Sequence, residues 1–105
     1  MTSSAENFPT RLSDLEVARL RADFPVLAQR PHGRPLAYLD NANSTQKPRA
    51  VIDAESHFYA TDYAGVHRAV YELAERATRA YEAGREAARR FLHAPDMHEV
   101  ILLRG

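Results

Sequence analysis

The feature that most constrains the fold is an unbroken apolar run, Val100 to Leu103, near the end of the printed sequence. A run without polar alternation is typical of a strand buried on both faces of a parallel sheet. Such a strand needs neighbours, and Leu36–Leu39 is one possible partner. Two short strands do not make a stable sheet. The sequence therefore predicts the N-terminal part of a longer α/β protein, cut where its first central strand ends.

Three helices are predicted before that strand. Ser13 and Glu16 have the spacing of a capping box and predict a helix over about 14–22. A proline suits the first turn of a second helix, over about 48–59. A third helix, over about 70–92, carries an apolar stripe at three- and four-residue steps: Val70, Leu73, Ala74, Ala77, Tyr81, Gly84, Ala88 and Phe91. Its i,i+4 acid–base pairs are Glu72–Arg76, Glu75–Arg79 and Glu86–Arg90. As given, the chain is predicted to be predominantly helical.

Composition narrows the classes of function. The formal net charge is zero, which argues against a nucleic-acid or anionic-membrane binder, because such proteins need a basic excess. There is no cysteine, so the chain can form neither a disulfide nor a thiolate metal site. The histidines show no metal-ligand spacing, and no metal is expected. No apolar run approaches a membrane span, and the N-terminus lacks a secretory pattern. We expect a cytoplasmic protein.

Several separate motifs carry a family resemblance. They are RADFPVL (Arg21–Leu27), LAYLDNANSTQKP (Leu36–Pro48), VIDA (Val51–Ala54), YAGVHRA (Tyr63–Ala69) and VILLRG (Val100–Gly105). In this order and spacing they resemble the N-terminal quarter of the SUF-type cysteine desulfurases. Those enzymes belong to the class-V aminotransferase group of pyridoxal-phosphate (PLP) enzymes, and selenocysteine lyases are among their relatives. The resemblance runs from about Val17 to the last residue.

The resemblance implies a homodimeric enzyme of fold type I that uses PLP. It would remove sulfur from L-cysteine, or act on L-selenocysteine, and leave alanine and a persulfide for an acceptor protein of iron–sulfur cluster assembly. The cofactor supplies the electron sink in such enzymes. The implied organisation is a flexible lead-in (1–12), an N-terminal helix and connector on the small-domain side (13–34), and the start of the PLP-binding large domain (35–105).

The same resemblance suggests site residues. His67 would lie at the active-site mouth, where an imidazole can carry a proton at neutral pH, and Arg68 could hold a carboxylate through its planar fork. Asn41, Ala42 and Asn43 would line the substrate with small residues. Each has a plainer interpretation: a loop histidine bonded to backbone, an arginine tying down its own loop, and a capped turn. Asn43 departs from the usual pattern D-N/S-A-A-S/T, which puts substrate fit in question.

Lys47 is the only lysine, yet it matches the QKP segment at a helix start and not the family's Schiff-base lysine. That lysine, the pyridine-nitrogen aspartate, the ring-stacking histidine and the persulfide cysteine would all lie further along. The loop that holds the PLP phosphate would follow Gly105. No residue of this chain is therefore expected to bind the cofactor, and we expect the 105 residues alone to be inactive.

Two other interpretations remain open from the sequence. The chain could belong to a different class-V PLP enzyme, such as an epimerase or a kynureninase-like hydrolase. It could instead be a stand-alone helical module that dimerises through the alanine-rich third helix.

Overall fold

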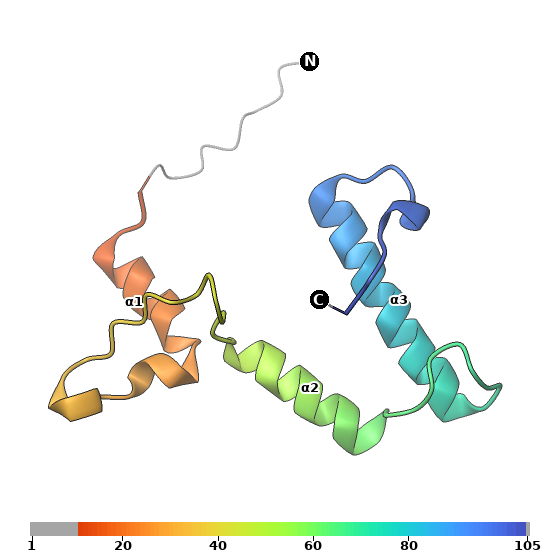
Figure 1. The fold of residues 1–105 in the computed structure, drawn as a ribbon, viewed down its shortest axis with the longest axis horizontal. Coiled ribbons are helices and arrows are strands. Elements are labelled where there is room, and N and C mark those ends of the chain that lie inside the picture. The colour runs from red at the N-terminus through yellow and green to blue at the C-terminus, as the bar shows by residue number, and fades with distance from the viewer. Residues whose placement is uncertain (1–10, 105) are drawn as a thin grey trace, which may run out of the picture. The chain divides into compact units, whose positions relative to one another are not determined.

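The computed structural model describes residues 11–104 (Figure 1). Its helices are α1 (Asp14–Ala22), α2 (Arg49–Thr61) and α3 (Glu72–Leu92), with short 3₁₀ turns η1 (Pro25–Ala28), η2 (Pro31–Gly33) and η3 (Met97–Glu99). The chain divides into two compact units, one up to Ala54 and the other from Glu55 on, with the boundary inside α2. Most of the predicted lead-in lies outside the described residues.

The capping box that predicts α1 is confirmed. The Ser13 hydroxyl accepts a hydrogen bond from the Glu16 N–H at 3.2 Å, and the Glu16 carboxylate accepts one from the Ser13 N–H at 2.7 Å. The capping box fixes the start of α1. Its end, at Ala22, also agrees with the prediction, because Pro25 disfavours helical backbone at the residue before it. The chain then turns into η1, against which α1 packs.

Side-chain bonds to backbone hold the rest of the first unit. The Arg21 guanidinium donates to the carbonyl oxygens of Leu27 and Leu36, and the Tyr38 hydroxyl donates to the Ser44 carbonyl at 2.6 Å. Residues 36–39, the predicted strand, are assigned to neither a helix nor a strand, and no strand is assigned elsewhere in the described part of the chain. A strand needs a ladder partner, so this segment is a connector here.

Helix α3 is the longest element and starts two residues later than predicted. Tyr71 is its N-cap and gives no side-chain cap, while His93 ends it in the left-handed conformation. The Ala94 N–H then donates to the Arg89 carbonyl at 3.0 Å, as in a Schellman ending. Val70 lies outside the helix and is 94% exposed, so it does not belong to the buried stripe.

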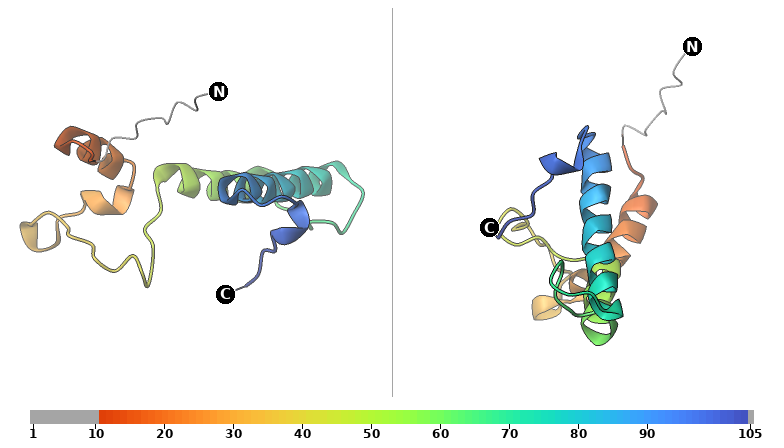
Figure 2. Two further views of the ribbon diagram at one scale, coloured as in Figure 1. Left: turned by 90° about the horizontal axis from the view of Figure 1, so that it is seen from above. Right: turned by 90° about the vertical axis from the view of Figure 1, so that its right-hand side faces the viewer.

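The packed face of α3 is rotated relative to the predicted stripe. Ala74 and Ala77 are buried, as predicted, but Phe91 is 85% exposed. The half-buried positions of α3 are Leu73, Thr78, Glu82, Arg85, Glu86, Ala88 and Arg89. The reason is that η3 turns back against α3 (Figures 1 and 2) and covers its polar border.

Ion pairs of α3 differ in part from the predicted set. Arg90 lies 3.9 Å from Glu86, which confirms that pair. Arg76 instead lies 3.5 Å from Asp62, just after α2. Neither of the other two predicted i,i+4 pairs forms among the described residues. A long arginine side chain can reach a carboxylate outside its own helix. Sequence spacing identifies only the possible partners within the helix, so it could not predict the pairing of Arg76 with Asp62.

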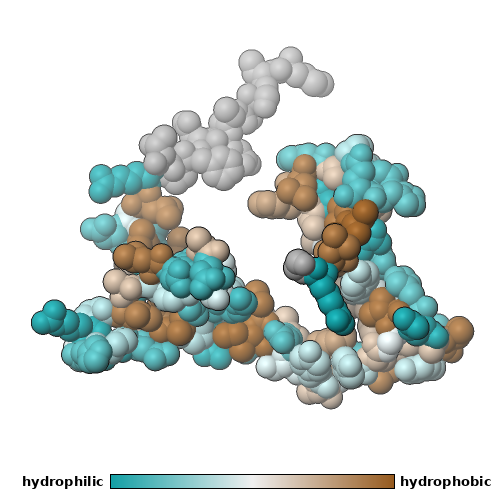
Figure 3. All heavy atoms as spheres, viewed as in Figure 1, coloured by the Kyte–Doolittle hydropathy of each residue, from teal (hydrophilic) through white to brown (hydrophobic). Residues whose placement is uncertain are grey.

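The apolar run after η3 begins at Val100, whose backbone is extended. Val100 is buried, whereas Ile101, Leu102 and Leu103 are 71%, 52% and 84% exposed. No strand is assigned between residues 11 and 104, so the parallel sheet stays a prediction. Apolar side chains are exposed on both units (Figure 3). No described helix is both long and apolar enough to cross a membrane.

Candidate active site

The loop before α3 presents His67, and α3 holds its backbone. His67 has a φ of 57°, in the left-handed region that residues other than glycine adopt infrequently. Its N–H donates to the Thr78 hydroxyl at 3.1 Å. The helix therefore stabilises a backbone conformation that would otherwise cost energy.

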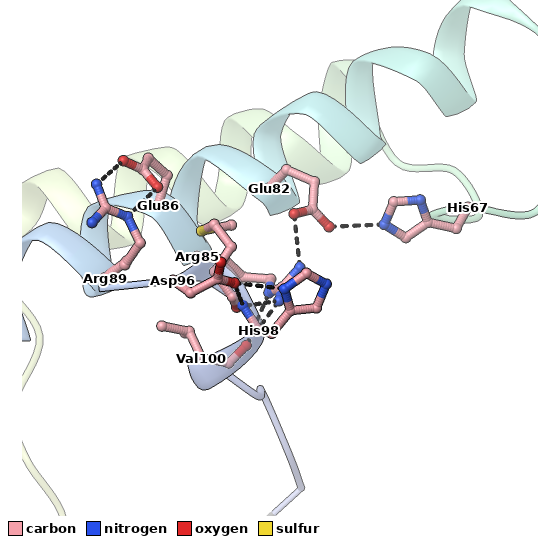
Figure 4. A network of polar contacts seen from close by, with 9 residues as sticks. His67, Glu82, Arg85, Glu86, Arg89, Asp96, His98 and Val100 are labelled. Carbon is pink, nitrogen blue, oxygen red and sulfur yellow. Dashed lines mark hydrogen bonds and ion pairs between the residues drawn. The ribbon is translucent and has the colours of Figure 1, made fainter. Parts of the chain in front are cut away.

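The imidazole of His67 is held by the same helix one turn further on. Its Nε2 lies 2.9 Å from Oε1 of Glu82 (Figure 4), and its ring meets the Tyr81 ring edge-on, with centroids 6.2 Å apart and planes at 89°. The side chain is still 57% exposed. The ring is thus oriented by protein groups yet accessible to a ligand.

Glu82 is in turn bound by Arg85. The Arg85 Nη1 donates to Oε2 of Glu82 at 2.8 Å. The rest of the guanidinium donates to the Val100 carbonyl at 3.1 and 2.9 Å and to the Met97 carbonyl at 2.9 Å (Figure 4). The hydrogen bond from His67, together with the charge and hydrogen bond of Arg85, lowers the pKa of the Glu82 carboxyl from its ordinary 4.5, against an opposing effect of desolvation.

A hollow of about 500 Å³ adjoins His67. The residues that line it are His67, Arg68, Ala69, Val70, Glu75, Thr78 and Arg79. The structure therefore brings His67 and Arg68 together at one concave surface. Two guanidinium groups and one imidazole at its rim suit a ligand with a carboxylate or another anionic group.

The other predicted site residues form a tight loop in the first unit. The Asn41 side-chain oxygen accepts from the Gln46 N–H at 3.1 Å. The Asn43 N–H donates to the Asp40 carbonyl at 3.1 Å, and its side-chain amide lies 3.4 Å from the Asp40 carboxylate. Ala42, between them, is exposed. These bonds are those of a capped turn, so Asn43 has a local role as a loop residue.

Asn41 also lines a second hollow, of about 460 Å³, beside α1 and η1. Its lining is mainly apolar: Leu12, Val17, Leu20, Phe24, Leu27 and Tyr38, with Arg21, Asn41, Thr45 and Gln46.

The residues present do not by themselves fit PLP. The cofactor needs a lysine amine in a pocket, whereas Lys47 Nζ donates to the Thr45 carbonyl of its own loop at 2.6 Å and lines neither hollow. In the described part of the chain, no three carboxylate or histidine side chains gather closely enough to hold a metal ion.

Thr78, Glu82 and Arg85 were not among the predicted site residues, although Thr78 and Glu82 contact His67 and Arg85 binds Glu82. A signal was available, because the three follow one another at steps of four and three and border the buried Ala74 and Ala77. Polar residues at helical spacing beside an apolar stripe occupy its edge. The spacing does not show which loop residue meets them.

Comparisons with known proteins agree on one family. The profile of the family described as Aminotransferase class-V matches residues 37–105. A cysteine desulfurase of Synechococcus elongatus is 50% identical over 90 residues, and a probable cysteine desulfurase of Mycobacterium leprae is 51% identical over 90. Each alignment covers 86% of this chain and 14% or 15% of the relative. A cysteine desulfurase of Yersinia pestis is 48% identical over 99 residues, which are 94% of this chain and 23% of the relative.

Proposed function

The chain belongs to the class-V aminotransferase family, and on this premise we propose that it is the N-terminal segment of a PLP-dependent cysteine desulfurase. The observation that carries the proposal is the identity of 48–51% to cysteine desulfurases of three genera, over 86–94% of this chain. The chain spans 14–23% of the length of these relatives. Activity is therefore proposed for the whole protein.

We propose that this segment supplies part of the substrate-side wall of the site. His67 would move a proton at the mouth, and Arg68 would hold the substrate carboxylate at the same hollow. The loop 41–43 would line the substrate through its small residues and backbone. In this proposal, residues 35–105 begin the PLP-binding large domain of a fold-type-I enzyme and 13–34 belong to the small-domain side. PLP, when bound, supplies the electron sink.

The substrate and partners in this proposal follow the family. The names of the relatives support L-cysteine as substrate, and L-selenocysteine is the alternative to compare. A homodimer, a sulfur-acceptor protein of iron–sulfur cluster assembly and a cytoplasmic location remain predictions from the sequence resemblance.

A chimera tests the proposal. The aligned N-terminal segment of the Yersinia pestis relative is replaced by this chain, and alanine release from L-cysteine is measured in the presence of PLP and a reductant. We expect a rate within about tenfold of the parent, which corresponds to about 1.4 kcal/mol in activation energy. The Asn43→Ala chimera is the matched variant, because it restores the small residue usual at that position.

Two results would contradict the proposal. One is a chimera that folds and takes up PLP like the parent, yet releases no alanine both as built and as Asn43→Ala. The other is racemisation of an amino acid without sulfur release, which would favour the epimerase interpretation.

A further inference from the structure

We propose that Glu82 is a positioning residue that fixes His67 in one tautomer, with the ring proton on Nε2 and with Nδ1 as the proton-accepting atom, and that Arg85 orients Glu82 for this task. The significance for catalysis rests on the proposed function. The tautomer itself does not, because it follows from contacts inside the second unit.

One helix fixes the geometry of His67. His67 is fixed at its backbone by Thr78, at its ring edge by Tyr81 and at Nε2 by Glu82. All three partners lie on α3 within five positions, so one rigid helix sets both the place and the orientation of the imidazole. A carboxylate that binds only one ring nitrogen selects the tautomer, because an ionised carboxylate accepts but cannot donate.

Glu82 is held as a carboxylate with both oxygens in use. Arg85 stays protonated and binds Oε2 while His67 meets Oε1. The two oxygens are therefore used by different partners, and the carboxylate cannot rotate without losing one of them. A fixed, ionised acceptor is what a histidine needs if it is to keep the proton on Nε2.

Arg85 also links Glu82 to the segment that follows α3. The same guanidinium binds the carbonyl oxygens of Met97 and Val100. Val100 is buried, so Arg85 also fixes the start of the extended segment. Through Arg85, the orientation of Glu82 and the position of residues 97–100 depend on each other.

The chemical consequence is a defined base. Nδ1 lies on the side of the ring away from Glu82 (Figure 4) and carries the lone pair in the neutral ring. It can take one proton from an incoming group, and the imidazolium so formed keeps its Nε2–H bond to the carboxylate. In acid–base catalysis of this kind, the histidine transfers the proton, and the carboxylate orients the ring and stabilises the imidazolium.

A second histidine, His98, contacts its carboxylate through the other ring nitrogen. His98 lies 2.5 Å from the Asp96 carboxylate through Nδ1 instead of Nε2. The same logic predicts that neutral His98 carries its proton on Nδ1. The two histidines should therefore show opposite tautomers in one sample. His32 is exposed and has no such carboxylate partner among the described residues, so it provides the reference.

Nitrogen-15 NMR of the full 105-residue chain, labelled at histidine and held at a pH where the rings are neutral, tests the proposal. The ring shifts and couplings of each histidine report which nitrogen carries the proton. We expect His67 to be Nε2–H with less of the Nδ1–H form than His32, and His98 to favour Nδ1–H. A His67 ring with the same tautomer distribution as His32 would overturn the proposal.

Variants separate positioning from general structural support. Glu82→Ala should move the His67 tautomer distribution to that of His32, while Glu86→Ala should leave it unchanged. Glu86 is the matched control because it is a carboxylate on the same helix, bound at 2.7 Å by Arg89 instead of His67. Equal effects of the two variants on His67, at equal helical circular dichroism, would also overturn the proposal.

This experiment contains no cofactor or substrate. An inactive chimera with the predicted His67 tautomer would reject the proposed function and leave the positioning role intact. An active chimera, combined with a His67 ring whose tautomer distribution equals that of His32, would support the proposed function and reject the positioning role.

Discussion

Three residues of the described chain other than glycine have positive φ, and all three are histidines: His32, His67 and His93. This conformation costs an L-residue roughly 1–2 kcal/mol relative to the right-handed one. At His67 the residue with this strained backbone belongs to the candidate site, since its ring is held by Glu82 beside a hollow. At His93 it accompanies only the end of a helix.

Replacing His93 by glycine should therefore stabilise α3. Glycine adopts a φ near 55° without strain, and this gain exceeds the entropy that glycine adds to the unfolded chain. We expect His93→Gly to raise the free energy of unfolding by about 0.5–1 kcal/mol. The measurement is urea unfolding followed by circular dichroism.

His93→Ala is the matched control, because it removes the same ring and keeps the strain. It should give no gain. If alanine stabilised the helix as much as glycine, the side chain and not the backbone would be responsible.

At the scale of the element, α3 organises the second unit. Its buried alanines allow close approach, and its polar border binds both the loop before it, at His67, and the segment after it, at Val100. The border depends on charge, so its contribution to stability should depend on pH.

The pKa of Glu82 is lowered chiefly by the hydrogen bond from His67, and that of Glu86 chiefly by the hydrogen bond from Arg89. A carboxyl whose folded-state pKa is lowered stabilises the fold above its unfolded pKa, here 4.5. It loses that contribution as the pH falls through the folded value. The urea midpoint of α3 should therefore fall as the solution is acidified below about pH 4.5.

Glu82→Gln removes one of these titrations. Its urea midpoint should be lower than that of the unmodified chain at neutral pH and should change less on acidification. The double variant with Glu86→Gln should flatten the profile further. A variant profile as steep as that of the original chain would show that these carboxyls do not control acid stability.

At the scale of the whole molecule, the chain is short and its described part has little buried surface. It spans 14–23% of its relatives, and few of the described side chains are buried: Ala74, Ala77 and Val100. Its family implies PLP, yet its single amine side chain lies on an exposed loop, bound to the Thr45 carbonyl. A Schiff base there would be open to hydrolysis, because water is not excluded.

We therefore expect no stable PLP adduct on Lys47. The chain is mixed with one equivalent of PLP, reduced with borohydride and mapped by mass spectrometry. Lys47→Arg keeps the charge without an amine that can react, and its absorbance spectrum should match that of the original chain. A stoichiometric reduced adduct on Lys47 would contradict this expectation.

Local signals made much of the fold predictable. The spacing of Ser13 and Glu16 predicted the start of α1, and both hydrogen bonds of the capping box are present. The prediction was possible because a capping box involves neighbours in sequence. The extent of α3 was predicted to within two residues at its start. The stripe was only partly correct, since Phe91 is exposed and the half-buried face includes Glu82 and Arg85.

The candidate site was also predictable only in part. His67 and Arg68 were identified from a motif, and they share a hollow. The role of Glu82 could not be predicted, because it lies fifteen positions from His67 and meets it only when the loop folds onto α3. Asn43 was questioned as a departure from the family pattern, and the structure shows it bonded to Asp40 within its loop.

The sequence by itself determined the family, the three helices and the predominance of helix, because motifs, caps and periodicity act between residues close in the chain. Only the tertiary structure decided which side of α3 is packed, which carboxylate Arg76 meets and which carboxylate meets Nε2 of His67. Those outcomes depend on contacts between distant segments, whose geometry no local pattern specifies.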